Sequence, residues 1–184
     1  MKFTPQSIKD VILIESTVHG DNRGYFVETF RQDLFEEALG YKVNFVQDNE
    51  SKSTKGVLRG LHYQLPPYTQ AKLVRVIEGS VLDVAVDIRK SSPTFGQHVS
   101  VELTAQNKHQ LFVPHGFAHG FIVLSDSATF AYKVDNYYAP EHDRGIAFND
   151  AQLKIDWQLS AEELQLSDKD TIHPSLVNAK DLFN

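Results

Sequence analysis

Short runs of alternating apolar and polar residues, separated by turn residues, dominate the pattern along the chain. They predict strands at 11–14, 25–30, 45–49, 57–64, 72–77, 81–88, 98–103, 110–113, 119–124, 129–137 and 146–148. Helical spacing predicts one helix over 31–39 that ends at Gly40, and a brief second helix with Ser160 as N-cap and Glu163 completing a capping box. Many short strands with few helices are typical of a β-sandwich or a β-barrel.

The strands at 72–77 and 81–88 give the clearest hairpin signal, because only the turn residues 78–80 separate them. The second of these strands alternates along its length. One predicted face carries Leu82, Val84, Val86 and Ile88, and the other carries Val81, Asp83, Ala85 and Asp87. The chain contains no linker and no repeat of 20 to 50 residues, so we expect one domain over residues 1–184.

Composition narrows the classes of partner. The chain has no cysteine, which excludes disulfides and Cys-ligated metals. Its formal charge is 18 − 24 = −6 without a basic block, which argues against nucleic-acid binding. Residues 1–5 lack the apolar core of a signal peptide, and no apolar run reaches the roughly 20 residues that a membrane helix needs, so we expect neither. We therefore expect a cytoplasmic protein with no nucleic-acid or membrane partner.

Two of the eight histidines lie in apolar segments punctuated by glycine: His62 in 56–64 and His119 in 114–121. Three interpretations are open. Both can be buried, hydrogen-bonded core histidines. They can also be acid–base groups, since histidine titrates near neutral pH. Finally, the Pro-x-Gly-x-x-His pattern that ends at His119 resembles half of the cupin metal motif. The other half would need His-x-His, but Gln64 takes the second place, leaving fewer than three ligands.

Basic residues flank the first of these histidines. Arg59 and Lys72 bracket His62, and Arg23 lies in a glycine turn. They can be solvated residues of a sheet edge. An ammonium near a base can also stabilise an enolate, and a guanidinium can bind a phosphate. Strict alternation puts Arg59 and His62 on opposite faces, so a common face requires a bulge, which Gly60 could form.

Three further polar or aromatic features stand out. Tyr132 and Tyr138 share strand parity, so both are predicted to face the barrel interior. There a tyrosine can pack in the core, donate a proton or stack on a base. The polar run 47–49 fits either a turn or a surface that binds a sugar. The segment 168–170 reads as a solvated loop by composition.

Taken together, these motifs resemble the dTDP-4-dehydrorhamnose 3,5-epimerase family, from about Val11 to Asp170. The segments that carry the resemblance are 21–26, 47–49, 57–64, 70–74, 83–89, 92–96, 114–121 and 132–138. The resemblance implies an all-β, cupin-type jelly-roll barrel with a few short peripheral helices. It also implies a homodimer, a dTDP-sugar substrate, and no metal or redox cofactor.

The resemblance assigns roles to individual residues. His62 resembles the base, Asp170 the carboxylate that orients it, Tyr132 the acid on the opposite face, and Lys72 the group that stabilises the enolate. The positions that resemble substrate contacts are Arg23, Glu28, Gln47, Asn49, Arg59, His119 and Lys169, with Tyr138 stacking on the thymine. Asp48, within the polar run 47–49, is also predicted to bind substrate. Asp143 stands where the family often has glutamate, which keeps the charge but shortens its reach.

The implied reaction converts dTDP-4-keto-6-deoxy-D-glucose to dTDP-4-keto-L-rhamnose, on the route to dTDP-L-rhamnose. Removal and return of protons at C3 and C5 needs two acid–base groups on opposite sides of the sugar. An epimerase of a single carbon, a metal-dependent cupin and a non-catalytic sugar-binding barrel are the alternatives that the sequence leaves open.

Overall fold

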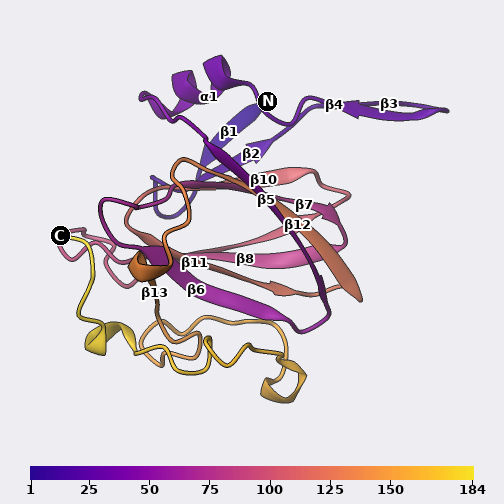
Figure 1. Cartoon of the computed structure of the whole chain (residues 1–184). Helices are drawn as coiled ribbons and strands as arrows, with labels where there is room; N and C mark the ends of the chain where they lie inside the picture. The colour runs from indigo at the N-terminus through magenta and orange to yellow at the C-terminus, as the bar shows by residue number, and fades with distance from the viewer.

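Two antiparallel sheets pack face to face in the computed structural model, which describes residues 1–184 (Figure 1). The six-stranded sheet has the order β1 (Lys2–Pro5), β2 (Ile12–Glu15), β10 (His109–Val113), β7 (Lys72–Glu78), β12 (Ser127–Val134) and β5 (Gln47–Thr54). The five-stranded sheet has the order β13 (Asp143–Gly145), β6 (Leu58–Gln64), β11 (Phe117–Val123), β8 (Ser80–Asp87) and β9 (His98–Thr104). Strands β3 (Val18–Asp21) and β4 (Gly24–Val27) pair only with each other.

The helices are short and peripheral. They are α1 (Gln32–Leu39) and the 3-10 turns η1 (Pro140–His142), η2 (Ala161–Glu163) and η3 (Leu176–Asn178). None of them has the length and apolar character that a membrane-spanning helix requires. Helix α1 ends as predicted, because Gly40 adopts a left-handed φ of 77° and its N–H bonds the Glu36 carbonyl. The predicted capping box is also confirmed, since the Ser160 N–H donates to the Glu163 carboxylate at 3.1 Å.

Apolar side chains fill the space between the sheets and cover both outer faces. The central core includes Val74, Phe121 and Phe130. A second core lies between the outer face of the five-stranded sheet and the C-terminal segment, which contributes Trp157. A third forms where α1 inserts Phe35 against the outer face of the six-stranded sheet. Burying apolar surface on both faces of each sheet favours this layered arrangement.

Strand β8 confirms the predicted alternation, with both of its faces buried. Leu82, Val84, Val86 and Ile88 belong to the core under the C-terminal segment, whereas Val81 and Ala85 belong to the central core. The predicted hairpin with β7 is wrong, however, because β7 and β8 belong to different sheets. Gly79 lets the chain cross between the sheets, since a Cβ there would lie 2.0 Å from the Ser127 carbonyl oxygen. Long-range pairing therefore overrides the local turn signal.

Four other predicted boundaries are corrected by the structure. Strand β4 ends at Val27, so residues 28–30 are not strand. The strand predicted at 45–49 begins instead at Gln47 and continues to Thr54 as β5, which excludes the alternative turn at 47–49. Strand β12 ends at Val134, before the predicted end at 137. The strand predicted at 146–148 lies instead at 143–145, because β13 pairs with the end of β6.

Candidate active site

A cavity of about 400 Å³ opens between the two sheets. It is lined by Gln47, Asn49, His62, Tyr63, Gln64, Gln70, Lys72, Tyr132, Tyr138, Asp143 and Lys169. Its volume lies within the range of roughly 300–1,000 Å³ that is typical of small-molecule sites. Eight of the residues predicted from the sequence therefore meet in one place, drawn from strands β5, β6, β7, β12 and β13 and from two loops.

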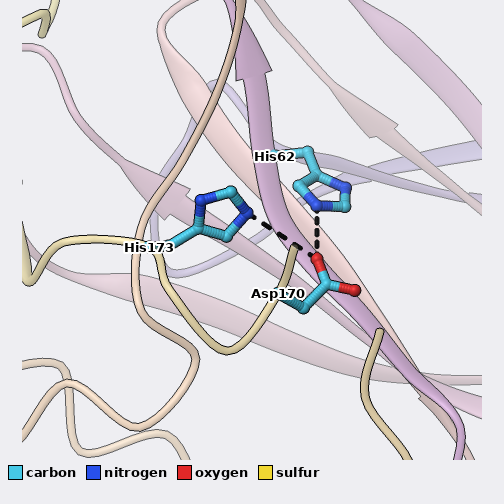
Figure 2. A group of neighbouring side chains, drawn as sticks. All are labelled: His62, Asp170 and His173. Atoms are coloured by element: carbon cyan, nitrogen blue, oxygen red, sulfur yellow. Dashed lines mark hydrogen bonds and ion pairs between the residues drawn. The ribbon is translucent and has the colours of Figure 1, made fainter. Parts of the chain in front are cut away.

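His62 is held from behind by a buried carboxylate. Its Nε2–H donates to Asp170 Oδ1 at 2.6 Å, and the Ser167 hydroxyl donates to the other carboxylate oxygen at 2.8 Å (Figure 2). Burial alone would raise the pKa of Asp170, but the hydrogen bonds from His62 and Ser167 outweigh it and hold that pKa below its ordinary value. The carboxylate is therefore charged, and it leaves His62 Nδ1 as the ring nitrogen free to exchange a proton.

The composition-based interpretation of segment 168–170 is wrong at its last position. Asp170 is only 4% exposed, and it reaches His62 from a loop 108 residues further along the chain. The side chain of Lys169, by contrast, is half exposed and pairs with Asp143 at the cavity edge. Two charged residues that are adjacent in sequence can thus differ in burial, and composition does not reveal which of them is buried.

Lys72 places a cation in the cavity. Removal from water lowers the pKa of its ammonium to about 8, and the negative charges of Asp143 and Asp83 only partly offset this effect. No hydrogen bond within the chain engages its ammonium. Lys72 is therefore available to a negative charge that develops on a bound molecule.

Tyr132 lies on the opposite wall from His62. It belongs to β12 of the six-stranded sheet, beside Asn49 of β5, whereas His62 belongs to the five-stranded sheet. Burial raises the pKa of Tyr132, and the nearby charge of Arg59 opposes that rise. The phenol therefore carries its proton at neutral pH, and two groups able to transfer protons face the same space from opposite sides.

A β-bulge at Gly60 brings Arg59 and His62 to a common face, as the sequence-based hypothesis required. Arg59 pairs with Phe121 and His62 pairs with His119, so two residues of β6 oppose the single Gly120 of β11. Gly60 has a φ of +132° and its Cα approaches Gly120 so closely that a Cβ would lie 2.5 Å from the Gly120 Cα. The guanidinium of Arg59 then reaches the Ser53 hydroxyl, 3.2 Å away.

His119 and Tyr138 differ from their predicted settings. His119 does not line the cavity: it is 6% exposed, and its Nε2 lies 2.9 Å from the buried Asp83 carboxylate. Burial lowers the pKa of His119, with Asp83 opposing. Tyr138 lines the cavity, but from a loop beyond β12, so strand parity is not what places it. Its hydroxyl donates to Asp143 at 3.3 Å.

Three further predicted substrate contacts lie away from the cavity, and Arg59, like His119, is not among the residues that line it. Asp48 is on the outer face of β5 and bonds the Lys133 ammonium at 2.9 Å, because strand alternation points Gln47 and Asn49 inward and Asp48 outward. Asp48 therefore does not line this cavity. Arg23 is at the tip of the β3–β4 hairpin, which Figure 1 shows extending away from the barrel, and the exposed Glu28 follows that hairpin.

Other residues at the site were not singled out from the sequence. Gln64, Gln70 and Tyr63 line the cavity. The parity of β8 placed Asp83 on an apolar face, a signal that a buried partner was needed. His173 is not one of the two histidines that the sequence singles out, yet its side chain is only 9% exposed. Burial and the neighbouring His62 lower the pKa of His173, while Asp170 opposes.

The cupin-type ligand positions do not fit a metal ion. The Nε2 atoms of His62 and His119 point to two different carboxylates, those of Asp170 and Asp83. The Gln64 side chain is committed to the backbone, donating to the Tyr68 carbonyl at 2.7 Å and accepting from the Ala139 N–H at 2.7 Å. These donors do not converge on one point, so no reaction step is assigned to a metal at these positions.

The two packed sheets, and the cavity between them that holds the paired His62 and Asp170, define a cupin-type β-barrel enzyme. Residues 5–178 match the family model described as dTDP-4-dehydrorhamnose 3,5-epimerase, and the chain belongs to this family. A dTDP-4-dehydrorhamnose 3,5-epimerase of Shigella flexneri is 57% identical over 97% of this chain and 98% of that protein.

Solved structures agree with this assignment and confirm the expected fold. The epimerase of Legionella pneumophila in complex with dTDP-4-keto-L-rhamnose has a TM-score of 0.95 and 51% identity, covering 100% of this chain and 97% of that chain. A 3'-monoepimerase of Streptomyces bikiniensis in complex with dTDP-quinovose has a TM-score of 0.90 and 36% identity, covering 96% of this chain and 88% of that chain.

Proposed function

We infer that the chain is a dTDP-4-dehydrorhamnose 3,5-epimerase, which converts dTDP-4-keto-6-deoxy-D-glucose to dTDP-4-keto-L-rhamnose in dTDP-L-rhamnose biosynthesis. The observation that carries this function is the placement of His62 and Tyr132 on opposite walls of one cavity. Inversion of a carbon centre requires a proton to leave on one face and return on the other. Membership of the family supports the same substrate class.

The reaction uses the acidity that the C4 ketone confers on the C–H bonds at C3 and C5. His62 Nδ1 accepts the proton, and the electron pair of the broken C–H bond moves into the enolate, whose oxygen the Lys72 ammonium stabilises. Tyr132 then donates its proton to the same carbon from the opposite face, which inverts the centre. Asp170 holds the imidazole in position and stabilises the imidazolium that forms. Proton exchange with solvent restores both groups.

One comparison favours a double epimerase over an epimerase of one carbon. The chain is more similar to the relatives named as 3,5-epimerases than to the 3'-monoepimerase. The same proposed acid–base pair can serve either carbon once the sugar shifts or rotates between them. We propose that Tyr138 stacks on the thymine ring, and its exposure at the cavity rim supports this role.

A homodimer is part of the proposal. The β3–β4 hairpin exposes Tyr25 and Phe26, which are 61% and 69% exposed, and an isolated two-stranded hairpin is marginally stable. We propose that the hairpin packs on a second copy of the chain and carries Arg23 and Glu28 to the cavity of that copy. A cytoplasmic location stays a prediction from the sequence.

Replacement of each acid–base group tests the function. In D₂O, His62→Ala should lose both turnover and deuterium entry at C3 and C5, measured by NMR of the sugar. Tyr132→Phe should lose inversion more than exchange, because His62 can still remove a proton and return it to the same face. Each loss should be about 10²- to 10⁴-fold, the range for a general acid or base.

Tyr137→Phe is the matched control, since Tyr137 is exposed and lies outside the cavity. It should retain turnover, and circular dichroism should show all three variants folded. Full activity in His62→Ala would refute the assignment of the base.

A further inference from the structure

The imidazole of His173 lies beside the His62–Asp170 pair and has no part in the proposed reaction. His173 Nε2 is 3.7 Å from Asp170 Oδ1, and the rings of His173 and His62 are 5.5 Å apart between centroids (Figure 2). It is also the one buried side-chain nitrogen or oxygen in the chain that has no hydrogen-bond partner. Buried polar atoms are nearly always paired, so this nitrogen calls for an explanation.

The three side chains converge on one point. His62 Nε2, Asp170 Oδ1 and His173 Nε2 all lie within 4.8 Å of one another, and in Figure 2 both ring nitrogens point at the same carboxylate oxygen. A tetrahedral Zn²⁺ site with bonds of about 2.0–2.2 Å places its donors roughly 3.3–3.5 Å apart. The two distances to Asp170 Oδ1, 2.6 Å from His62 and 3.7 Å from His173, bracket that value.

Local packing holds the three donors in place. The His173 ring lies against Gly145, where a Cβ would come within 2.4 Å of His173 Nε2. Gly145 therefore leaves the space that the ring occupies. Ser167 fixes the second oxygen of Asp170, and the His62 side chain, 29% exposed, opens the cluster to the cavity. An ion can thus enter from the cavity and meet donors that are already oriented.

We propose that His62, Asp170 and His173 bind one divalent transition-metal ion such as Zn²⁺, and that the bound ion inhibits proton transfer by His62. Two imidazole nitrogens and one carboxylate oxygen are a donor set that Zn²⁺ accepts, with water in the fourth position. An ion on His62 Nε2 moves the ring proton to Nδ1, so the nitrogen that must accept the substrate proton has no free lone pair. The inhibition, but not the binding, rests on the proposed function.

Zinc titration by calorimetry tests the binding without reference to activity. His173→Phe removes the donor nitrogen but keeps a ring to pack on Gly145, and His173→Ala is a second variant in case the larger ring disturbs the fold. His109→Ala, on β10, controls for zinc held by histidines elsewhere. We expect one ion per chain in the unmodified protein and in His109→Ala, with at least tenfold weaker binding in both His173 variants. Equal binding in the unmodified protein and both His173 variants would overturn the site.

The effect on the reaction is measured separately, as deuterium entry at C3 and C5 with and without Zn²⁺. We expect zinc to inhibit the unmodified enzyme, a chelator to restore it, and His173→Phe to remain active but at least tenfold less sensitive. Binding that depends on His173 without any loss of exchange would overturn the inhibition and, with it, the role of His62 as the base. Absence of exchange in metal-free enzyme would refute the proposed function, while the calorimetry still decides the site.

Discussion

Gly60→Ala tests the bulge that aligns Arg59 with His62. The φ of +132° is a conformation that an alanine adopts at a cost of about 1–3 kcal/mol. The new Cβ would also lie 2.5 Å from the Gly120 Cα and 2.9 Å from the His119 carbonyl oxygen. Both neighbours are backbone atoms of the adjacent strand, so β6 and β11 must separate, and overpacking of this kind costs about 1–3 kcal/mol. We therefore expect a loss of about 2–6 kcal/mol in the free energy of unfolding.

Gly40→Ala is the matched control. Gly40 also has a positive φ, +77°, but a Cβ there would meet nothing within 4 Å and it lies outside the hairpin proposed to contact a second copy, so its loss should be only about 1–3 kcal/mol from the backbone term. Urea unfolding at one protein concentration, followed by fluorescence of the single buried Trp157, measures both variants in one cooperative transition. Gly60→Ala should also lose activity while folded, because the strand shift moves Arg59 relative to His62. Equal losses of stability in the two variants would refute the close approach of β6 and β11.

Three further predictions concern charge and assembly. Because the pKa of Lys72 is lowered to about 8, kcat/KM should fall as pH rises above about 8, and Lys72→Arg should move that alkaline limb upward; an unmoved limb would contradict the role of Lys72. Burial would raise the pKa of Asp87, but hydrogen bonds from Arg89 and neighbouring hydroxyls hold that pKa at about 2. The Asp87 carboxylate therefore contributes fully to stability above the ordinary pKa of 3.8, and this contribution is lost as pH falls toward 2. Acid unfolding curves should show this loss, and Asp87→Asn should remove it. Phe26→Asp should convert a homodimer to monomers in sedimentation experiments; an unchanged mass would contradict packing of the hairpin on a second copy.

Features set by neighbouring residues could be predicted from the sequence. Gly40 ends α1 because a residue without a Cβ adopts left-handed φ freely, and Ser160 with Glu163 forms a capping box within one turn. The alternation in 81–88 predicted two distinct faces, and both are buried as separate cores. In each case the physical cause lies within a few residues of the signal.

Strand pairing could not be predicted in the same way. The residues 78–80 have the composition of a hairpin turn, yet the strands that they join pair with other partners, because each one is buried from both sides by distant segments. The sequence predicts a strand over 45–49 and also one polar run at 47–49; the period of two in that strand sends Asp48 to the face opposite Gln47 and Asn49.

Parts of the candidate site could not be predicted from the sequence pattern alone. Parity placed Arg59 and His62 on opposite faces, and only the need for a cation beside a base suggested a bulge at Gly60, which the pairing with β11 contains. No periodicity links His62 to Asp170, because 108 residues separate them and the loop that carries Asp170 resembles solvated sequence. Family resemblance supplied that partner, but not His173, which meets the same carboxylate. The polar composition of a short loop predicts exposure to solvent. That prediction fails where another part of the chain packs over the loop, so a buried polar group on a loop is identified only from the folded structure.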